Sequence, residues 1–333
     1  MKKRKYLLAA YIFLIFLLTG CSRADSLTGG KTAIGEDKDY DWLPQTAGEK
    51  EILLYDKYDQ RIITYDIDQH KVIQKNDTLN YLQFEFNDLT SDIYTTGHSI
   101  ENDYKIIKLG KDKIDILYEA DQMEALFPLA YRDPEYMIFL KCTYQDNGAE
   151  LYGDRVVCRF NEKTKTLTEI AETKGMRVTN GAIVGDMLYL TEYDAGTDRY
   201  ALYMLSMSGN EKPILLLDNL AAGEIYSNND ALWISDASKI YCYEDDAVCF
   251  PKKILNYFYS NALVQIDISA NGSLELIVTN VETKKLEADT EGVIDVRIFD
   301  GKIKAYTDKA IVDLSRGMTS DLTLPVEKSG REK

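Results

Sequence analysis

Short runs of about five to eight apolar or alternating residues dominate the chain from Trp42 onward. The run Lys302 to Tyr306 places an apolar side chain at every second position, whereas Ile52 to Tyr55 is continuously apolar; both patterns are typical of strands. Turn residues such as Asn147-Gly148 separate these runs. Helical periodicity is nearly absent, and Asp121 to Leu126 is the one segment expected to form a helical turn. The pattern therefore predicts an all-β fold.

The predicted strands fall into groups of four. The full groups span Ala182–Leu217, Glu224–Phe250, Tyr257–Leu286, 81–118 and 126–171, with partial groups at 52–75 and 293–314. A sheet that is apolar on both faces can bury them only between two neighbours, as in a β-propeller. We therefore predict a propeller of about seven blades (six to eight), mostly four-stranded. A pair of β-sandwiches is the alternative, but it explains the grouping less well.

Residues 1–20 have the features of a signal peptide. Lys2 to Lys5 form a basic start, and Tyr6 to Leu18 form an apolar run that would reach only about 20 Å as a helix, short of the ~30 Å hydrocarbon core. The run ends in Leu18-Thr19-Gly20-Cys21, which resembles the lipobox of bacterial lipoproteins. A plain secretory signal followed by a chance cysteine is the alternative.

The lipobox resemblance implies cleavage before Cys21 and a diacylglyceryl thioether, with fatty acyl chains of the palmitate kind, on that residue. We then expect attachment to the cell membrane through this lipid, with the domain facing the outside of the cytoplasm. Residues 21–41 are small and polar, which predicts a flexible tether. The predicted propeller domain covers 42–326, and 327–333 form a polar tail.

The net charge of the chain limits the classes of partner that it can bind. The chain has 39 basic and 55 acidic residues, a net charge of −16, and removing residues 1–20 brings this to −20. Such an acidic domain is repelled by anionic membrane surfaces and lacks the basic footprint of nucleic-acid binding. We therefore expect no nucleic acid among the partners and attachment through the lipid alone.

The predicted architecture of residues 42–326 resembles bacterial propeller proteins of the TolB/YncE-like kind. There is no WD dipeptide and no kelch signature, and Ser227 to Trp233 matches only part of an Asp-box. The resemblance therefore implies a fold and names no ligand.

Four further cysteines bracket two predicted hairpins: Cys142 with Cys158, and Cys242 with Cys249. If Tyr144 faces Val156, Cys142 faces Cys158; a four-residue loop at Glu244–Ala247 would likewise make Cys242 face Cys249. Facing residues of antiparallel strands can form disulfides, and an extracytoplasmic location permits oxidation. Four buried thiols are the alternative, because cysteine is among the most buried residue types.

No catalytic constellation is complete. The chain has two histidines, His70 and His98, and it lacks a G-x-S-x-G elbow, a P-loop and a G-x-G-x-x-G motif. His98 and Ser99 are adjacent, but neighbours on a strand point to opposite faces, so they form no nucleophile–base pair. We therefore assign no catalytic residue, metal ligand or cofactor.

Loops between second and third strands share one end of a propeller, and here they are the long ones: Gly97–Asp103, Gln145–Asp154 and Asp194–Arg199. Binding residues concentrate on such loops. The candidate binding residues are His98, Tyr152, Asp154, Tyr193, Asp198 and Arg199, and solvated loops without a ligand are the alternative.

Three functions remain open. The first is a non-catalytic, membrane-anchored module that binds an envelope protein, a glycan or another ligand. The second is an envelope hydrolase on a propeller scaffold. The third is the solute-binding lipoprotein of a transporter, which normally needs α/β lobes that this helix-poor pattern does not predict.

Overall fold

The structure is a computed structural model. It describes residues 42–44, 51–56, 61–66, 68–69, 71–75, 81–86, 93–99, 104–109, 114–121, 123–144, 154–208, 211–228, 231–259, 261–270, 272, 274–284, 286–291, 293–299, 302–307, 310–313 and 318–321. The predicted signal peptide, the predicted lipidation residue Cys21 with its predicted tether, the candidate residue Tyr152 and the predicted polar tail lie outside these residues.

The described strands form seven four-stranded antiparallel sheets, called blades 1 to 7 in chain order. Blade 1 contains β1 (Trp42–Pro44), β2 (Glu51–Asp56), β3 (Arg61–Asp66) and β4 (Lys71–Lys75). Blade 2 contains β5 (Tyr81–Phe86), β6 (Ile93–Ser99), β7 (Tyr104–Leu109) and β8 (Ile114–Glu119). Blade 3 contains β9 (Glu124–Tyr131), β10 (Met137–Thr143), β11 (Val156–Asn161) and β12 (Thr166–Ile170).

Blades 4 to 7 repeat this arrangement. Blade 4 contains β13 (Val178–Val184), β14 (Met187–Asp194), β15 (Arg199–Ser206) and β16 (Ile214–Leu220). Blade 5 contains β17 (Ile225–Asn228), β18 (Ala231–Ser235), β19 (Lys239–Cys242) and β20 (Cys249–Pro251). Blade 6 contains β21 (Leu255–Tyr259), β22 (Ala262–Ile268), β23 (Leu274–Asn280) and β24 (Leu286–Glu291). Blade 7 contains β25 (Val293–Phe299), β26 (Lys302–Thr307), β27 (Ala310–Asp313) and β28 (Met318–Asp321).

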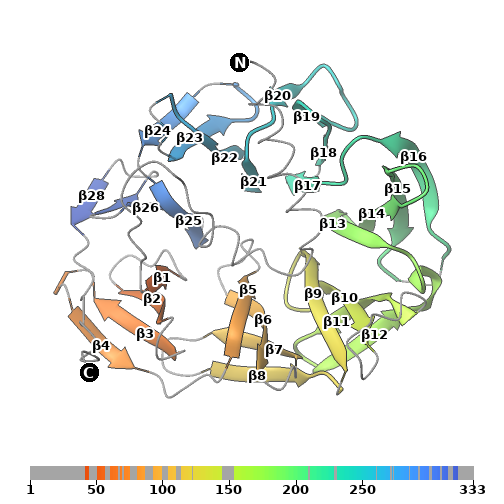
Figure 1. The fold of residues 1–333 in the computed structure, drawn as a ribbon, viewed down its shortest axis with the longest axis horizontal. Coiled ribbons are helices and arrows are strands. Elements are labelled where there is room, and N and C mark those ends of the chain that lie inside the picture. Colours follow the sequence, from red (N-terminus) through yellow and green to blue (C-terminus); the bar gives the residue numbers. More distant parts are fainter. Residues whose placement is uncertain are drawn as a thin grey trace.

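The blades stand around a ring, with the first strand of each blade nearest the centre (Figure 1). First strands of neighbouring blades contact one another, as β9 does β13 and β13 does β17. The predicted all-β propeller is therefore confirmed. The alternative of two sandwiches is wrong, because the sheets follow one another around a ring and are not stacked in pairs.

The two groups that were partial in the sequence are complete blades. The short strand β1 completes blade 1, and β28 completes blade 7. Among the described strands, no sheet borrows a strand from another part of the chain, because every sheet consists of four consecutive strands.

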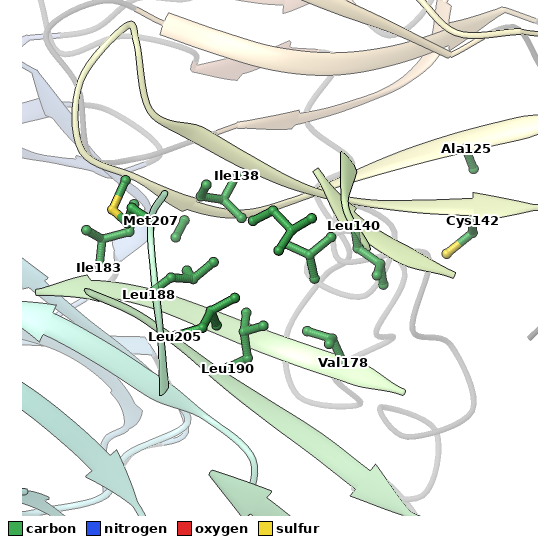
Figure 2. Close-up of a cluster of buried hydrophobic side chains, with 13 residues drawn as sticks. Ala125, Ile138, Leu140, Cys142, Val178, Ile183, Leu188, Leu190, Leu205 and Met207 are labelled. Carbon is green, nitrogen blue, oxygen red and sulfur yellow. The ribbon is translucent and has the colours of Figure 1, made fainter. Parts of the chain in front are cut away.

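Alternation along β14 shows why each blade needs two neighbours. Leu188 and Leu190 point into the core shared with blade 3, while Tyr189 points into the core shared with blade 5. Figure 2 shows Leu188, Leu190 and Leu205 of blade 4 facing Ile138 and Leu140 of blade 3. Fully burying a side chain of this size contributes about 1.5–3 kcal/mol. The cores between blades therefore hold the ring together.

The helical turn expected at Asp121 to Leu126 is wrong. The backbone makes one turn there, in which the Glu124 amide donates to the Asp121 carbonyl at 3.1 Å, and β9 then begins at Glu124. Leu126 is fully buried on that strand, so its packing favours extended backbone. A short 3-10 turn, η2 (Ala171–Thr173), follows the last strand of blade 3.

The expected register of Cys142 and Cys158 is also wrong. Val156 pairs with Lys141, so Cys158 faces Phe139 across the β10–β11 ladder. The difference of three residues is odd, so it moves Cys158 to the opposite face of the sheet from Cys142. Cys142 packs in the core shared with blade 4.

The second cysteine pair is offset by one residue. Cys249 pairs with Tyr241, and the Cys242 amide donates to the Val248 carbonyl at 3.0 Å. Cys242 and Cys249 therefore lie on opposite faces of blade 5. None of the four cysteines is disulfide-bonded in the structure.

Replacing Leu190 with Ala tests the packing between blades. Leu190 is fully buried between blades 3 and 4, so Leu190→Ala should lower the free energy of unfolding by about 2–5 kcal/mol. Leu215→Ala is the matched control, because Leu215 on the outer strand β16 is 51% exposed and should change it by less than about 0.5 kcal/mol. Equal losses in chemical denaturation would contradict the packing described.

Thiol alkylation tests the cysteine positions. Burial raises the pKa of the Cys158 thiol to about 12, so little reactive thiolate forms at pH 8, whereas Cys249 is exposed. In the folded protein, iodoacetamide should modify Cys249 quickly and leave Cys158 unmodified, as read by peptide mass spectrometry. After unfolding without reductant, all four sites should react. A site that reacts only after reduction would show a disulfide.

Candidate binding rim

Antiparallel strands alternate in direction, so two kinds of loop emerge at the same end of the ring. These are the loops between second and third strands and the loops that enter the next blade. The described segments at this end of blades 3 to 6 include 154–155, 171–177, 194–199, 221–224, 236–238 and 252–254, and these six are here called the candidate rim.

The hairpin between β14 and β15 is held by its own side chains. Asp194 accepts hydrogen bonds from the Thr197 hydroxyl at 2.7 Å and the Gly196 amide at 2.8 Å, which lower the pKa of the Asp194 carboxyl. Asp198 has a φ of 54°, a conformation uncommon for residues other than glycine. Its Oδ1 accepts a hydrogen bond from the Tyr193 hydroxyl at 3.0 Å, which raises the pKa of Tyr193. An exposed hairpin thus presents an oriented tyrosine.

A second tyrosine, Tyr200, lies beside Tyr193 on the neighbouring strand β15. The rings of Tyr193 and Tyr200 have centroids 5.2 Å apart and planes tilted by 49°. Tyr200 in turn lies against the backbone of Gly223, where a Cβ atom would come within 2.4 Å of the ring. The Thr191 hydroxyl donates to the Gly223 carbonyl at 2.6 Å, and burial raises the pKa of Tyr200. The two tyrosine rings, on β14 and β15, are therefore held against the loop that leads into blade 5.

The segment 171–177 connects blade 3 to this hairpin. The Gly175 amide donates to the Arg155 carbonyl at 2.8 Å, and the Tyr193 amide donates to the Arg177 carbonyl at 3.0 Å. Lys174 forms an ion pair with Asp154 at 3.1 Å. These contacts join the second-to-third-strand loops of blades 3 and 4 into one surface.

Ion pairs continue the candidate rim across blades 5 and 6. Lys252 Nζ donates to Glu224 at 2.5 Å, and Lys253 Nζ donates to Asp267 at 2.6 Å. Beneath them, the buried Gln265 amide donates to Asn256 Oδ1 at 2.7 Å. The loop that enters blade 6 is thus held both to the loop that enters blade 5 and to strand β22 of its own blade.

A half-buried lysine lies below the candidate rim on blade 3. Lys141 Nζ is 3.0 Å from Glu124 Oε1 and 2.6 Å from Glu169 Oε1. Burial lowers the pKa of Lys141, but hydrogen bonds to Glu169 and Glu124 outweigh this and raise it above its usual value. The raised pKa keeps the lysine charged at neutral pH, and its ion pairs join strands β9, β10 and β12 of blade 3.

The structure brings some of the predicted site residues together. Tyr193, Asp198 and Arg199 belong to one hairpin, and Asp154 joins them through the segment 171–177. His98 lies on β6 of blade 2, where its backbone pairs with Gln83 and Tyr104. Arg199, at the start of β15, is exposed and pairs with Asp194 across the ladder.

Glu192 also connects these loops, because its Oε1 accepts a hydrogen bond from the Arg177 amide at 3.2 Å. Sequence reasoning missed the residues that connect the loops: Lys174, Arg177, Glu192, Tyr200, Gly223, Glu224 and Lys252. Five of them (Lys174, Arg177, Gly223, Glu224 and Lys252) lie on loops that enter the next blade, so a search of those loops could have found them. Glu192 and Tyr200 lie on strands β14 and β15, outside such a search.

The described residues contain neither a cluster of metal-ligating side chains nor a membrane-spanning helix. Among them, no three His, Cys, Asp or Glu side chains lie together in a way that could hold a metal ion. No helix of that part of the chain has the length and apolar character needed to cross a membrane.

Solved structures share this architecture. An uncharacterised protein from Listeria monocytogenes is 12% identical, with a TM-score of 0.59 and coverage of 87% of this chain and 96% of the other. An acylaminoacyl peptidase from Pyrococcus horikoshii is 10% identical, with a TM-score of 0.58; the match covers 85% of this chain and 52% of the peptidase. No protein-family model and no curated protein sequence matches this chain. At such identities the likeness shows the fold alone.

Adding a methyl group at Gly223 tests the support of the tyrosine pair. Gly223→Ala should push the Tyr200 ring aside and lower the free energy of unfolding by about 1–3 kcal/mol. In Tyr200→Ala protein, the same substitution should cost much less, since the clash is gone. A double-mutant cycle measures this coupling, and additive costs would contradict the close contact.

Proposed function

We propose that the protein is a lipid-anchored, extracytoplasmic module that binds an envelope protein or glycan through the candidate rim without catalysing a reaction. The observation that carries the proposal is the hairpin of Tyr193, Asp198 and Arg199. It presents an oriented aromatic ring and charged groups at the surface, and neighbouring loops hold it in place. Such fixed aromatic and charged side chains are typical of binding surfaces, because little conformational freedom is lost on binding.

The sequence supports the anchored location. The tetrapeptide Leu18-Thr19-Gly20-Cys21 follows a basic start and a short apolar run, and a small polar segment separates Cys21 from Trp42. The acidic domain would be kept away from an anionic membrane surface by charge repulsion. The tether would then leave the candidate rim accessible to a partner in the envelope.

Crosslinking in cells tests the proposal. The tagged, lipidated protein is crosslinked in the source bacterium, and copurifying molecules and crosslinked sites are identified by mass spectrometry. We expect one envelope component in stoichiometric amount, with crosslinks at 154–155, 171–177 and 194–199. Arg199→Glu should reduce the yield severalfold, because it reverses a charge on the exposed hairpin.

Two controls separate the parts of this proposal. Cys21→Ser should release the protein from the membrane fraction. Lys163→Glu makes the same charge reversal on an exposed loop at the opposite end of blade 3 and should leave capture unchanged. If crosslinks scatter over the ring or nothing specific is captured, the binding proposal is wrong, and turnover of envelope glycans and peptides would instead favour the hydrolase.

A further inference from the structure

A second cluster lies at the end of the ring opposite the candidate rim, between blades 3 and 4. Arg132 and Tyr136 belong to the turn between β9 and β10, Arg159 lies on β11, and Met207 follows β15. These four residues are here called the arginine cluster. Figure 2 shows Met207 beside Ile183 at one end of the core between the two blades. The proposed function does not use this surface.

Two guanidinium groups converge on one tyrosine ring. The Cζ atom of Arg132 lies 3.9 Å from the centroid of Tyr136, and that of Arg159 lies 5.4 Å from it. Both also reach Met207: Arg132 Nη1 is 3.9 Å from the sulfur, and Arg159 Nη1 donates to the carbonyl at 3.4 Å. Two like charges are therefore held close together at a partly buried site.

The two arginines differ in how their charges are balanced. Arg132 Nε donates to Asp133 at 2.9 Å, and its Nη1 donates to Asp186 at 3.1 Å. Among the described residues, Arg159 forms no ion pair with a carboxylate, and its hydrogen-bond partner is the Met207 carbonyl. The chain has 55 acidic residues against 39 basic ones, so carboxylates are not scarce. Arg159 is thus a half-buried cation whose Nε and Nη2 donors remain open.

Both guanidinium groups lie over the Tyr136 ring, Arg132 closely and Arg159 at 5.4 Å, and this position affects what their donors can bind. A guanidinium that lies over an aromatic ring keeps its N–H groups in its own plane, where a carboxylate can accept two parallel hydrogen bonds. We propose that Arg159, assisted by Arg132, binds a carboxylate group of an external ligand at the arginine cluster.

The surrounding charges favour a carboxylate over a phosphate. Asp133 and Asp186 lie within hydrogen-bond distance of Arg132, and the whole chain is strongly acidic, so a dianion is repelled more than a monoanion. The side chain of Asp186 is 96% exposed. Its ion pair with Arg132 therefore contributes little to stability and can give way to an incoming carboxylate.

Titration with matched probes tests this site. The probes are an acetylated, amidated Gly-Glu-Gly peptide with its Gly-Gln-Gly equivalent, and glucuronate with glucose, so that each acidic probe is a monoanion. Binding to the full lipidated chain in detergent is measured by calorimetry and by the NMR signal of the Arg159 Nε–H group. We expect at least one carboxylate probe to bind and shift that signal, while neither neutral equivalent does.

Variants then locate the binding. Arg159→Gln should weaken it about ten- to a hundredfold, as expected for loss of a charged hydrogen-bonded pair. Arg159→Lys keeps the charge but loses the planar donors, so it should also weaken binding and serves if the first variant fails to fold. Lys163→Gln, on the neighbouring exposed loop, is the charge-matched control and should bind normally.

The outcomes are distinct. Binding of the peptide alone or of the sugar acid alone supports the proposal and identifies the source of the carboxylate. Binding that is equal for acidic and neutral probes, that is stronger for inorganic phosphate, or that Lys163→Gln weakens as much as Arg159→Gln does, would overturn it. So would the absence of binding by both acids.

Discussion

Packing between the faces of adjacent sheets is the interaction on which this structure depends. A single blade such as β13–β16 is apolar on both faces, as Leu188 and Tyr189 on opposite sides of β14 illustrate. Neither face can be covered by the blade itself, because four strands make only one layer. In the ring, the two neighbouring blades bury both faces of each sheet. Neighbouring blades therefore share cores such as the one around Trp233, Phe250 and Phe258.

The surface features depend on this framework in different ways. At the candidate rim, main-chain hydrogen bonds and ion pairs connect the loops of neighbouring blades, as between Gly175 and Arg155. The arginine cluster instead rests on a ring and a thioether at the end of a shared core. The two ends of this pair of blades are therefore held in different ways, the candidate rim by main-chain hydrogen bonds and ion pairs between loops and the arginine cluster by contacts with a tyrosine ring and a methionine.

Much of the fold could be predicted from the sequence because alternation and turn residues are local properties. The strand groups 182–217 and 224–250 correspond closely to β13–β16 and β17–β20. Register is different, because it depends on loop length and on which face is buried. In the β19–β20 ladder Cys249 pairs with Tyr241, one residue away from Cys242, and nothing in the local sequence pattern indicates this register.

The same limit applies to the candidate site. Tyr193 and Asp198 could be predicted because a five-residue separation across a short hairpin brings them together. Their support by Tyr200 and Gly223 could not, since it depends on how closely blade 4 approaches the loop that enters blade 5. The approach of Arg132 and Arg159 to one ring likewise depends on packing between elements that lie apart in the sequence.

Because each described sheet consists of consecutive strands, the order of blades around the ring is the order of synthesis. Each new blade can pack on the one made just before it, so most interfaces join parts of the chain that are close in sequence. The meeting of β1–β4 with β25–β28, neighbours in Figure 1, instead joins the two distant ends of the domain. Closing that seam carries the largest loop entropy of any step. Until the last blade has been made, the chain is an open arc with uncovered apolar faces at both ends, and its dependence on chaperones would be greatest there.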